Sequence, residues 1–571
     1  MEDRTVPTTT FPVINANDMG TGSLRAAITQ ANLNPGADII DLTGVSGTIT
    51  LTSGELEITD PVTITGPGGG SLVVSGNNTS RIFGIDNGAA GFIDVTIDGL
   101  TLTGGNAGTG DGGAIKVADE NLSLSGVIIS ANAASCGAGV YIGPGGHLNL
   151  SSSSLIGNNA TGTGAHAGGG AIFLDVSTGA TINDSGISNN QSTSGSEGGG
   201  GIGVAGNGSV TIERTSISGN RVLGLFANGG GVSFISNGAL IIRSSTVSGN
   251  SATESGGGIF SGNAIATIDN STISGNAANF NGGGIYVTGG SLLARSTTIA
   301  FNAADSDNTA TGNGGGIFVE ASNSATLQGT MVANNVVGVT GQGPDIFGGV
   351  LATLSLVKNI DHTEVIAGSS GNFLGVDPLL RPLASNGGPT LTHALAAGSP
   401  AIDHGDNFAG TAFDERGAPF QRLIGSAVDI GAFELQSPTG GPPPPPGLQD
   451  PTPQAIQIAA QIVQTLQRGG TKLLAVAFPF GETNGDNFKD IVLAFRLRNG
   501  KLLLATLNGV QGSVLGAFQP FPPPLATGAR VQLVLLPIDA IPGNDIGVVI
   551  NGGGTGIPRV SAFTIHGARL L

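Results

Sequence analysis

The chain has 571 residues, of which 100 are glycine and none is tryptophan, and its formal net charge is −18 at pH 7. An acidic surface of this kind repels the phosphate backbone of nucleic acids and lacks the basic residues that bind anionic membranes. Collagen is excluded because glycine does not recur at every third position, and a hydrophobic content of 39% argues against a disordered chain. The composition favours a solenoid of short strands and tight turns.

Residues 1–40 form the first segment. Its start, Met1–Thr10 (MEDRTVPTTT), lacks the apolar core of a signal peptide, so we expect an export signal either to have been removed or to lie upstream of this start. Farther along, Ser23 is a good helix N-cap before LRAAITQAN. Four apolar residues of that stretch fall on one face: Leu24, Ala27, Ile28 and Ala31. This pattern predicts a short amphipathic helix that covers the first coil. No apolar run reaches the roughly 18 residues that a transmembrane helix needs, so we expect no transmembrane segment.

Residues 41–343 contain an internal repeat with two signatures. The first is a glycine cluster followed by an aliphatic residue, and its copies begin at Gly112, Gly137, Gly168, Gly199, Gly229, Gly256, Gly282 and Gly314. The second is an aliphatic residue three positions before an asparagine, and its copies end at Asn132, Asn158, Asn190, Asn220, Asn250, Asn276, Asn302 and Asn335, with Gly105 in this anchor position of the first copy. Successive anchors are 27, 26, 32, 30, 30, 26, 26 and 33 residues apart. Constant motifs at a variable spacing indicate a fixed coil whose insertions emerge at one turn.

Apolar residues alternate before each anchor, which is typical of strands with one buried face. We expect the following residues to be buried in vertical stacks: Val210, Ile212, Ile217, Leu240, Ile242, Val247, Ala266, Ile268, Ile273, Leu292, Ala294 and Ile299. Two short strands, a turn that contains the asparagine, and a third strand led by glycine would make one triangular coil. The repeat therefore predicts an all-β, right-handed parallel β-helix of the pectate-lyase-like type, in which each asparagine can hydrogen-bond to its copy one coil away.

Seven residues before the anchor, charges alternate in sign from one copy to the next. The residues are Glu213, Arg243, Asp269 and Arg295. Stacked at strand spacing they would form an alternating-charge ladder, which is a favourable cross-strand arrangement. A catalytic role is the alternative, but exposed ion pairs are far commoner, so the sequence favours a structural ladder.

Two stretches resemble known bacterial families. The segment from Phe11, with NANDMGTGSLRAAITQANLNPGADIIDL and GTITLTSGELEITDPVTITGPG, resembles the N-terminal part of CSLREA-type β-helix proteins. Residues 344–436 closely resemble the choice-of-anchor Q domain, through DPLLRPLASNGGPTLTHALAAGSPAIDHGD, DERGAPFQR and AVDIGAFE. The repeats are also similar to those of polymorphic outer-membrane adhesins. These resemblances imply an exported bacterial protein whose residues 344–436 form terminal coils and a cap.

The remaining residues are divided by a proline run, GGPPPPPG, which predicts a stiff linker over 437–453. Residues 454–571 follow as a small β-rich module that begins with a helix expected over Gln454–Gln467 (QAIQIAAQIVQTLQ). In this module ETNGDNFKD resembles the calcium loop of FG-GAP or VCBS propeller repeats. The resemblance implies a Ca²⁺ ion with four side-chain ligands: Glu482, Asn484, Asp486 and Asp490. A hairpin turn without metal is the alternative for this loop. A second, shortened copy at Asp539–Asp545 is expected not to close a cage.

The sequence does not show the arrangement of catalytic residues that enzymes of this fold need. Inverting glycosidases need an acid and a base that flank one water molecule, whereas the repeat carboxylates Asp175, Glu197 and Glu254 are scattered. The six histidines show no metal-ligand spacing: His147, His166, His362, His393, His404 and His566. The single cysteine, Cys136, excludes a disulfide framework and is interpreted as a buried filler. We therefore expect no catalytic residues.

The sequence thus predicts an extracellular or surface-displayed β-helix that acts as a non-catalytic adhesive or structural stalk and contacts cell-surface glycans or proteins. The alternative is a carbohydrate-active β-helix enzyme, either a polysaccharide lyase or a glycoside hydrolase. A cleft with three or more convergent charged side chains would favour the enzyme. A uniform flank of Ser, Thr, Asn and Gly would favour the stalk. Apart from Ca²⁺ in the last module, we expect no cofactor.

Overall fold

A computed structural model of the chain falls into two compact units, Met1–Ser437 and Pro438–Leu571. In the first unit it describes residues 8–163, 168–176, 179–193, 198–309, 312–359, 363–365 and 371–436. In the second unit it describes seven strands: β48 (Lys472–Ala477), β49 (Ile491–Arg496), β50 (Leu502–Leu507), β51 (Val514–Phe518), β52 (Arg530–Leu535), β53 (Asp545–Asn551) and β54 (Arg559–Thr564). Strands β48 to β51 form one antiparallel sheet and β52 to β54 another. The predicted calcium loop and the helix expected over 454–467 lie outside the described residues.

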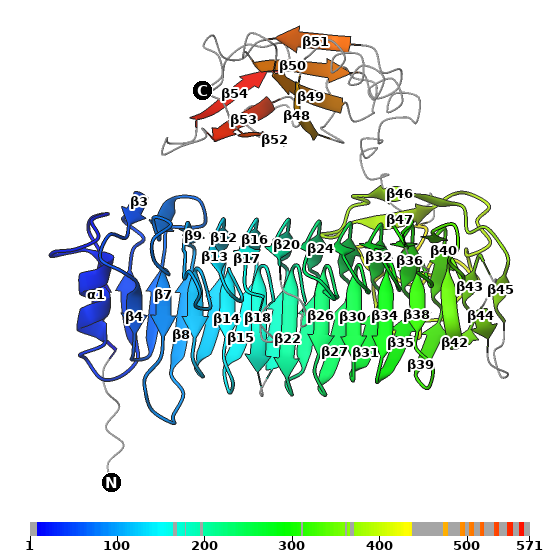
Figure 1. The fold of residues 1–571 in the computed structure, drawn as a ribbon, viewed down its shortest axis with the longest axis horizontal. Coiled ribbons are helices and arrows are strands. Elements are labelled where there is room, and N and C mark those ends of the chain that lie inside the picture. The colour runs from blue at the N-terminus through cyan, green and yellow to red at the C-terminus, as the bar shows by residue number, and fades with distance from the viewer. Residues whose placement is uncertain are drawn as a thin grey trace. The chain divides into compact units, whose positions relative to one another are not determined.

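The first unit is a solenoid of parallel β-strands, as the repeat predicted (Figure 1). Its coils stack into four ladders of strands, named here A, B, C and D. Ladder A holds β1 (Thr10–Pro12), β2 (Asp38–Asp41), β5 (Val62–Thr65), β8 (Asp94–Asp98), β11 (Asn121–Ser125), β15 (His147–Ser151), β19 (Gly179–Asn183), β23 (Val210–Glu213), β27 (Ala239–Arg243), β31 (Ile265–Asp269), β35 (Ser291–Arg295), β39 (Ser324–Gln328), β42 (Ile346–Thr353) and β44 (Thr363–Val365). Ladder B holds β3 (Gly47–Thr50), β6 (Leu72–Ser75), β9 (Thr101–Thr103), β12 (Ile128–Ser130), β16 (Ser154–Ile156), β20 (Gly186–Ser188), β24 (Ser216–Ser218), β28 (Thr246–Ser248), β32 (Thr272–Ser274), β36 (Thr298–Ala300), β40 (Met331–Ala333), β43 (Leu356–Val357) and β45 (Phe373–Leu374).

The other two ladders complete each coil. Ladder D holds eight two-residue strands: β13 (Ala133–Ala134), β17 (Asn159–Ala160), β21 (Gln191–Ser192), β25 (Arg221–Val222), β29 (Ser251–Ala252), β33 (Ala277–Ala278), β37 (Ala303–Ala304) and β41 (Val336–Val337). Ladder C holds β4 (Leu56–Ile58), β7 (Phe83–Ile85), β10 (Ile115–Val117), β14 (Val140–Ile142), β18 (Ile172–Val176), β22 (Ile202–Gly206), β26 (Val232–Ile235), β30 (Ile259–Gly262), β34 (Ile285–Thr288), β38 (Ile317–Val319) and the first part of β42. Within one coil the chain runs through A, B, D and C in that order. The expected turn after the asparagine is therefore also a short strand, because the two residues after the anchor pair with their copies in the next coil.

The predicted core residues are buried in vertical register. Ladder A aligns Val210 with Leu240 and Ile212 with Ile242, and all four side chains are inaccessible to solvent. The same holds in ladder B, where Ile217 aligns with Val247. The expected register and interior are thus confirmed.

The N-terminal helix is also confirmed. Helix α1 (Leu24–Ala31) begins after Ser23, whose hydroxyl accepts a hydrogen bond from the backbone N–H of Ala26. Its buried residues are the four that were expected to share a face: Leu24, Ala27, Ile28 and Ala31. The helix covers the open end of the first coils at the blue end of the solenoid (Figure 1). No helix among the described residues is long and apolar enough to cross a membrane.

At the other end of the solenoid, residues 377–436 form a cap that folds back along the outer face of ladder B. Strands β46 (Leu380–Ala384) and β47 (Thr392–Leu395) pair antiparallel within it. They lie beside the last strands of ladder B (Figure 1). The cap packs an apolar cluster around Met331 and Leu356 with its own Ile430 and Phe433.

Replacing Ile242 by Asp tests the interior assignment. The carboxylate would be buried in an apolar stack without a partner, which costs several kcal/mol. We expect the unfolding midpoint of the first unit in urea to fall strongly. The matched control is Ile241→Asp, because Ile241 is the neighbouring residue on the outward side of the same strand and is partly exposed. Equal losses in the two variants would contradict the assigned orientation of β27.

Candidate functional site

A cleft of about 460 Å³ lies on the outer face of ladder C over its first three coils. Its lining combines carboxylates and cations from strands β4, β7 and β10 and from the turns beside them. The lining residues are Glu55, Glu57, Ile58, Thr59, Arg81, Gly84, Ile85, Asp86, Asn87, Gly88, Lys116 and Ala118. Five of these are charged, and the sequence analysis did not predict that they meet.

The cleft exists because of one glycine. Glu57, Gly84 and Lys116 are register partners in successive strands, so they form one outward-facing row. Gly84 puts no side chain between the other two, and this gap is the floor of the cleft. A Cβ atom added at Gly84 would come within 3.1 Å of Glu55 Oε2 and would otherwise meet only that flexible side chain.

The two cations of the cleft differ in how they are bound. Arg81 donates to the carboxylate of Glu55 and, through Nε, to the carbonyl oxygens of Asp111 (3.1 Å) and Gly112 (2.9 Å). Lys116 makes no hydrogen bond within the described part of the chain. It lies near Asp111, whose pKa is raised by burial and lowered again by Lys116 and Arg81. Arg81 is therefore a structural clamp between coils, whereas Lys116 can reach a ligand.

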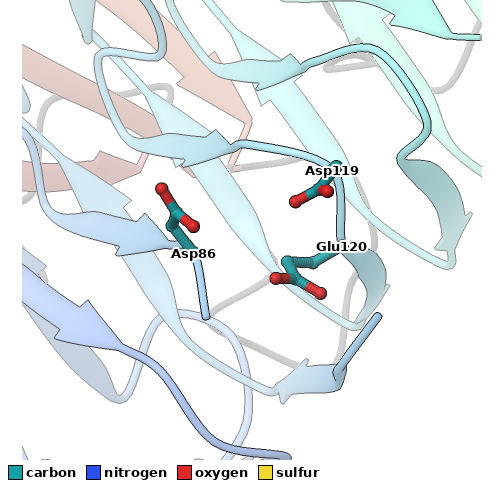
Figure 2. A group of neighbouring side chains, drawn as sticks. All are labelled: Asp86, Asp119 and Glu120. Carbon is teal, nitrogen blue, oxygen red and sulfur yellow. The ribbon is translucent and has the colours of Figure 1, made fainter. Parts of the chain in front are cut away.

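Three carboxylates at the edge of the cleft could hold a metal ion. Asp86, Asp119 and Glu120 each place one oxygen within 4.8 Å of the others (Figure 2). The buried Glu120 accepts hydrogen bonds from the backbone N–H groups of Asn87 (3.0 Å) and Ile93. Glu120 thus holds the loop between β7 and β8, and Asp86 also accepts from this loop, through the backbone N–H of Gly88 (2.7 Å).

Beyond the cleft, the outward row of ladder C becomes aromatic. Tyr141 stacks on Phe173, with ring centroids 6.0 Å apart. Farther along, the rings of Phe260, Tyr286, Phe318 and Phe347 form a continuous stack with centroids 5.1–5.3 Å apart and nearly parallel planes. Rings in this arrangement cover one another's faces, so they stabilise the coils, and the two inner rings have no free face for a sugar. The sequence signal was the aromatic residue that directly follows the glycine-led aliphatic residue, and the sequence analysis missed it.

The predicted alternating-charge ladder is confirmed in register. Ladder A aligns Glu213, Arg243, Asp269 and Arg295 in consecutive coils. Asp269 binds Arg295 at 2.6 and 2.8 Å and Arg243 at 3.5 Å. Glu213 pairs instead with its sequence neighbour Arg214. Each of these charges has an ion-pair partner, three within the ladder and Glu213 beside it, which fits a structural role.

The other residues singled out in the sequence remain apart. Cys136 is fully buried, as expected for a filler. Asp175 and Glu254 belong to different coils, and no described site brings them together. Glu197, His166, His362 and His566 lie outside the described residues, as do the four predicted calcium ligands, Glu482, Asn484, Asp486 and Asp490.

Several buried ionisable groups lie in the cap. Glu415 is fully buried and accepts hydrogen bonds from the hydroxyls of Thr272 and Thr390 (3.2 Å), and its Oε1 lies 3.0 Å from the hydroxyl oxygen of Thr246. Burial raises the pKa of Glu415 well above its usual value, and these hydrogen bonds oppose the rise only in part. Glu415 therefore fastens the cap to ladder B, and the raised pKa favours its neutral form there.

The raised pKa of Glu415 predicts a loss of stability as the pH rises above 4.5. The stabilisation is fully present below pH 4.5, the usual value, and is lost as the pH rises through the raised pKa of the folded state. We expect Glu415→Gln, which stays neutral, to lose less stability between pH 5 and pH 9 than the unchanged chain. Urea unfolding at both pH values measures this, and identical losses would show that Glu415 is not the titrating group.

One protein-family model matches the coils of the solenoid. Residues 113–299 and 163–354 match the model of the right-handed beta helix region. The structure is also similar to tailspike protein 2 from Escherichia coli O157:H7 bacteriophage CAB120, at 11% identity and a TM-score of 0.27, over 95% of this chain and 64% of that one. The chain thus spans less than two thirds of that protein, and at this TM-score we draw nothing from the likeness. No curated protein matches the sequence. The family match and the parallel coils that it covers support placing residues 113–354 in the right-handed β-helix family.

Proposed function

We propose that this chain is an exported surface or extracellular-matrix protein that acts as a non-catalytic adhesive stalk. The observation that carries the proposal is the outer face of ladder B before the cap, called here the hydroxyl face. Two columns of partly exposed hydroxyls run along it, at Thr101, Ser154 and Ser216 and at Thr103, Ser130, Ser188 and Ser218. Ile128, Ile156 and Gly186 interrupt them.

A flat face of this kind suits adhesion. Successive coils repeat at about 4.8 Å, so the hydroxyls are evenly spaced along the stalk. Each hydroxyl can donate and accept, as the hydroxyls of a glycan also can. Many weak hydrogen bonds over several coils would give affinity without a deep pocket, and they require no catalytic group.

A carbohydrate-active enzyme is the second candidate, and the cleft over Gly84 is the observation that favours it. Its charged lining meets the criterion of three convergent charged side chains. Proton transfer needs groups that are not already consumed by structure. Among the described residues, the side chains of Glu57 and Lys116 meet this condition and the Arg81–Glu55 pair does not, while Asp86 uses one oxygen to accept from the backbone N–H of Gly88 (2.7 Å). A hydrolase would use the two carboxylates as acid and base, and a lyase would use Lys116 as the base.

One experiment separates the two candidates. The full chain is applied to a glycan and protein binding array and, in parallel, to a polysaccharide-degradation screen. We expect binding without degradation, and a loss of at least tenfold in affinity for the double variant Ser188→Arg/Ser218→Arg. The matched control is Thr181→Arg/Thr211→Arg, at outward positions of ladder A in the same two coils. Unaltered binding by the hydroxyl-face variant would refute the proposal that the stalk binds through this face.

A separate variant tests whether the chain is a carbohydrate-active enzyme. Gly84→Phe fills the cleft without a strained backbone, because Gly84 does not have a positive φ angle. Gly186→Phe, at another open glycine on ladder B, is the control for a bulky insertion. Degradation of any polymer that Gly84→Phe abolishes and Gly186→Phe preserves would establish the enzyme instead.

We also propose that the C-terminal unit binds Ca²⁺ through Glu482, Asn484, Asp486 and Asp490. The support is the loop sequence, in which carboxylates at close spacing would repel one another without a cation. Calcium should raise the melting temperature of one calorimetric transition of the full chain, with a dissociation constant of about 10⁻⁴–10⁻³ M. Chelator should reverse the effect and Asp486→Ala should remove it. A calcium response that survives Asp486→Ala would place the ion elsewhere.

A further inference from the structure

The hydroxyl face does not end where the cap begins. Its two columns continue in register under the cap, with Thr246, Thr272 and Thr298 in one and Ser248 and Ser274 in the other. These five residues are at most 7% exposed. The cap therefore withdraws from solvent a surface of the same chemistry as the part that is left open.

The cap is held to these coils by hydrogen bonds. Besides the contacts of Glu415, the carbonyl oxygen of Leu391 accepts from Thr246 (2.6 Å), and the backbone N–H of Ala432 donates to Thr298 (3.0 Å). The apolar cluster of the cap lies farther on, around Met331 and Leu356. The cap thus has an apolar attachment at the last coils and a polar, water-replaceable attachment over the coils of Thr246 and Thr272.

One imidazole bridges the cap and the solenoid at the polar end. His393, in β47, is 2% exposed. Its Nδ1 lies 2.7 Å from the carbonyl oxygen of Arg381, which can only accept, so Nδ1 carries the proton. Nε2 then accepts from the hydroxyl of Ser274 at 2.8 Å. A second proton, on Nε2, would put a positive charge in this contact.

Nothing in contact with the imidazole would neutralise that charge. Among the described residues, its contacts are the Ser274 hydroxyl from β32, the Arg381 carbonyl from β46 and the ring of Phe301, 5.1 Å away. Other ionisable groups between the cap and the solenoid lie away from the imidazole. Glu415 is bound to three threonine hydroxyls, Asp377 pairs with Lys358 (2.8 Å), and His404 contacts the ring of Phe373. The remaining ionisable groups buried in the cap bind within the cap itself: Asp414, Arg416, Arg422, Asp429 and Glu434.

We infer that the cap is an acid-sensitive lid on the hydroxyl face: protonation of His393 at Nε2 releases the polar end of the cap and exposes Thr246, Ser248, Thr272 and Ser274. The inference rests on the proposed adhesive function of this face and adds its regulation. The apolar attachment around Met331 keeps the lid on the molecule when its polar end lifts.

The direction of the pH effect follows from burial. Burial lowers the pKa of His393 from 6.5 to about 4, and the hydrogen bond to the Arg381 carbonyl opposes this shift. Docking of the lid is therefore fully favoured above pH 6.5 and weakens as the pH falls from 6.5 towards 4. The two pKa values correspond to a weakening of the docking equilibrium by at most roughly 300-fold.

Hydrogen exchange of the full chain at pH 7 and pH 4.5, corrected for the intrinsic pH dependence of exchange, tests the lid. We expect peptides from residues 386–415 to lose protection at pH 4.5, while peptides from 205–222, in uncapped coils, do not. His393→Gln keeps a neutral donor and acceptor, so its lid should stay protected at both pH values. If this variant does not dock, Ser274→Ala should weaken protection already at pH 7 and keep the acid response.

Equal loss of protection at pH 4.5 in His393→Gln and in the unchanged chain would overturn the inference. The adhesive function is measured separately, as binding of the full chain to the glycan or protein that it binds on the array. A lid that opens at pH 4.5 without any change in binding, together with unaltered binding by Ser188→Arg/Ser218→Arg, would leave the lid standing and remove the adhesive face.

Discussion

The solenoid depends on a chain of buried asparagine side chains that passes through eight anchor positions. Each asparagine from Asn132 to Asn302 donates from Nδ2 to the side-chain oxygen of the anchor one coil farther on, at 2.9 Å. The same oxygen also accepts from the backbone N–H of the preceding anchor. Asn335, the last anchor, donates instead to the carboxylate of Asp345, ten residues on, at 2.8 Å. Because an unpaired buried amide costs about 1–3 kcal/mol, a slip of register in one coil would leave several such groups without partners. This series of side-chain hydrogen bonds ends at Asp345, because a carboxylate accepts hydrogen bonds but has no hydrogen to donate to a further residue.

Both repeat signatures are explained by the packing of these asparagine side chains. In one coil, the second amide hydrogen of Asn250 is donated to the carbonyl of Ile217, the aliphatic residue three positions before the preceding anchor. The glycine-led strand passes directly beside the same amide. A Cβ atom at Gly258 would lie 2.9 Å from Asn276 Nδ2 and 2.6 Å from the carbonyl oxygen of Gly284. The glycine clusters are thus required by close packing against the asparagine chain and against the next coil.

A core held in this way frees the outer faces for other uses. Ladder A carries an internal ion-pair ladder, ladder C carries the cleft and the stacked rings, and ladder B carries hydroxyls. The cap exploits the last of these, because hydroxyls can be satisfied equally by the cap, by water or by a ligand. A surface whose polar groups have such interchangeable partners can be covered and uncovered without a large penalty, which an apolar surface would not permit. The proposed adhesive face and its lid follow from this property.

The sequence by itself determined the coil. The spacing of the asparagines, the alternation before them and the Ser23 cap of α1 predicted the register, the buried stacks and the N-terminal helix, because each is a local or strictly periodic requirement. It did not determine the sites. The cleft joins Glu57, Asp86 and Lys116, which follow no common motif and meet only because Gly84 interrupts an outward row. The lid joins His393 to Ser274, 119 residues away in the chain. Contacts between non-periodic residues of distant segments depend on how the cap docks, and only the tertiary structure decided that.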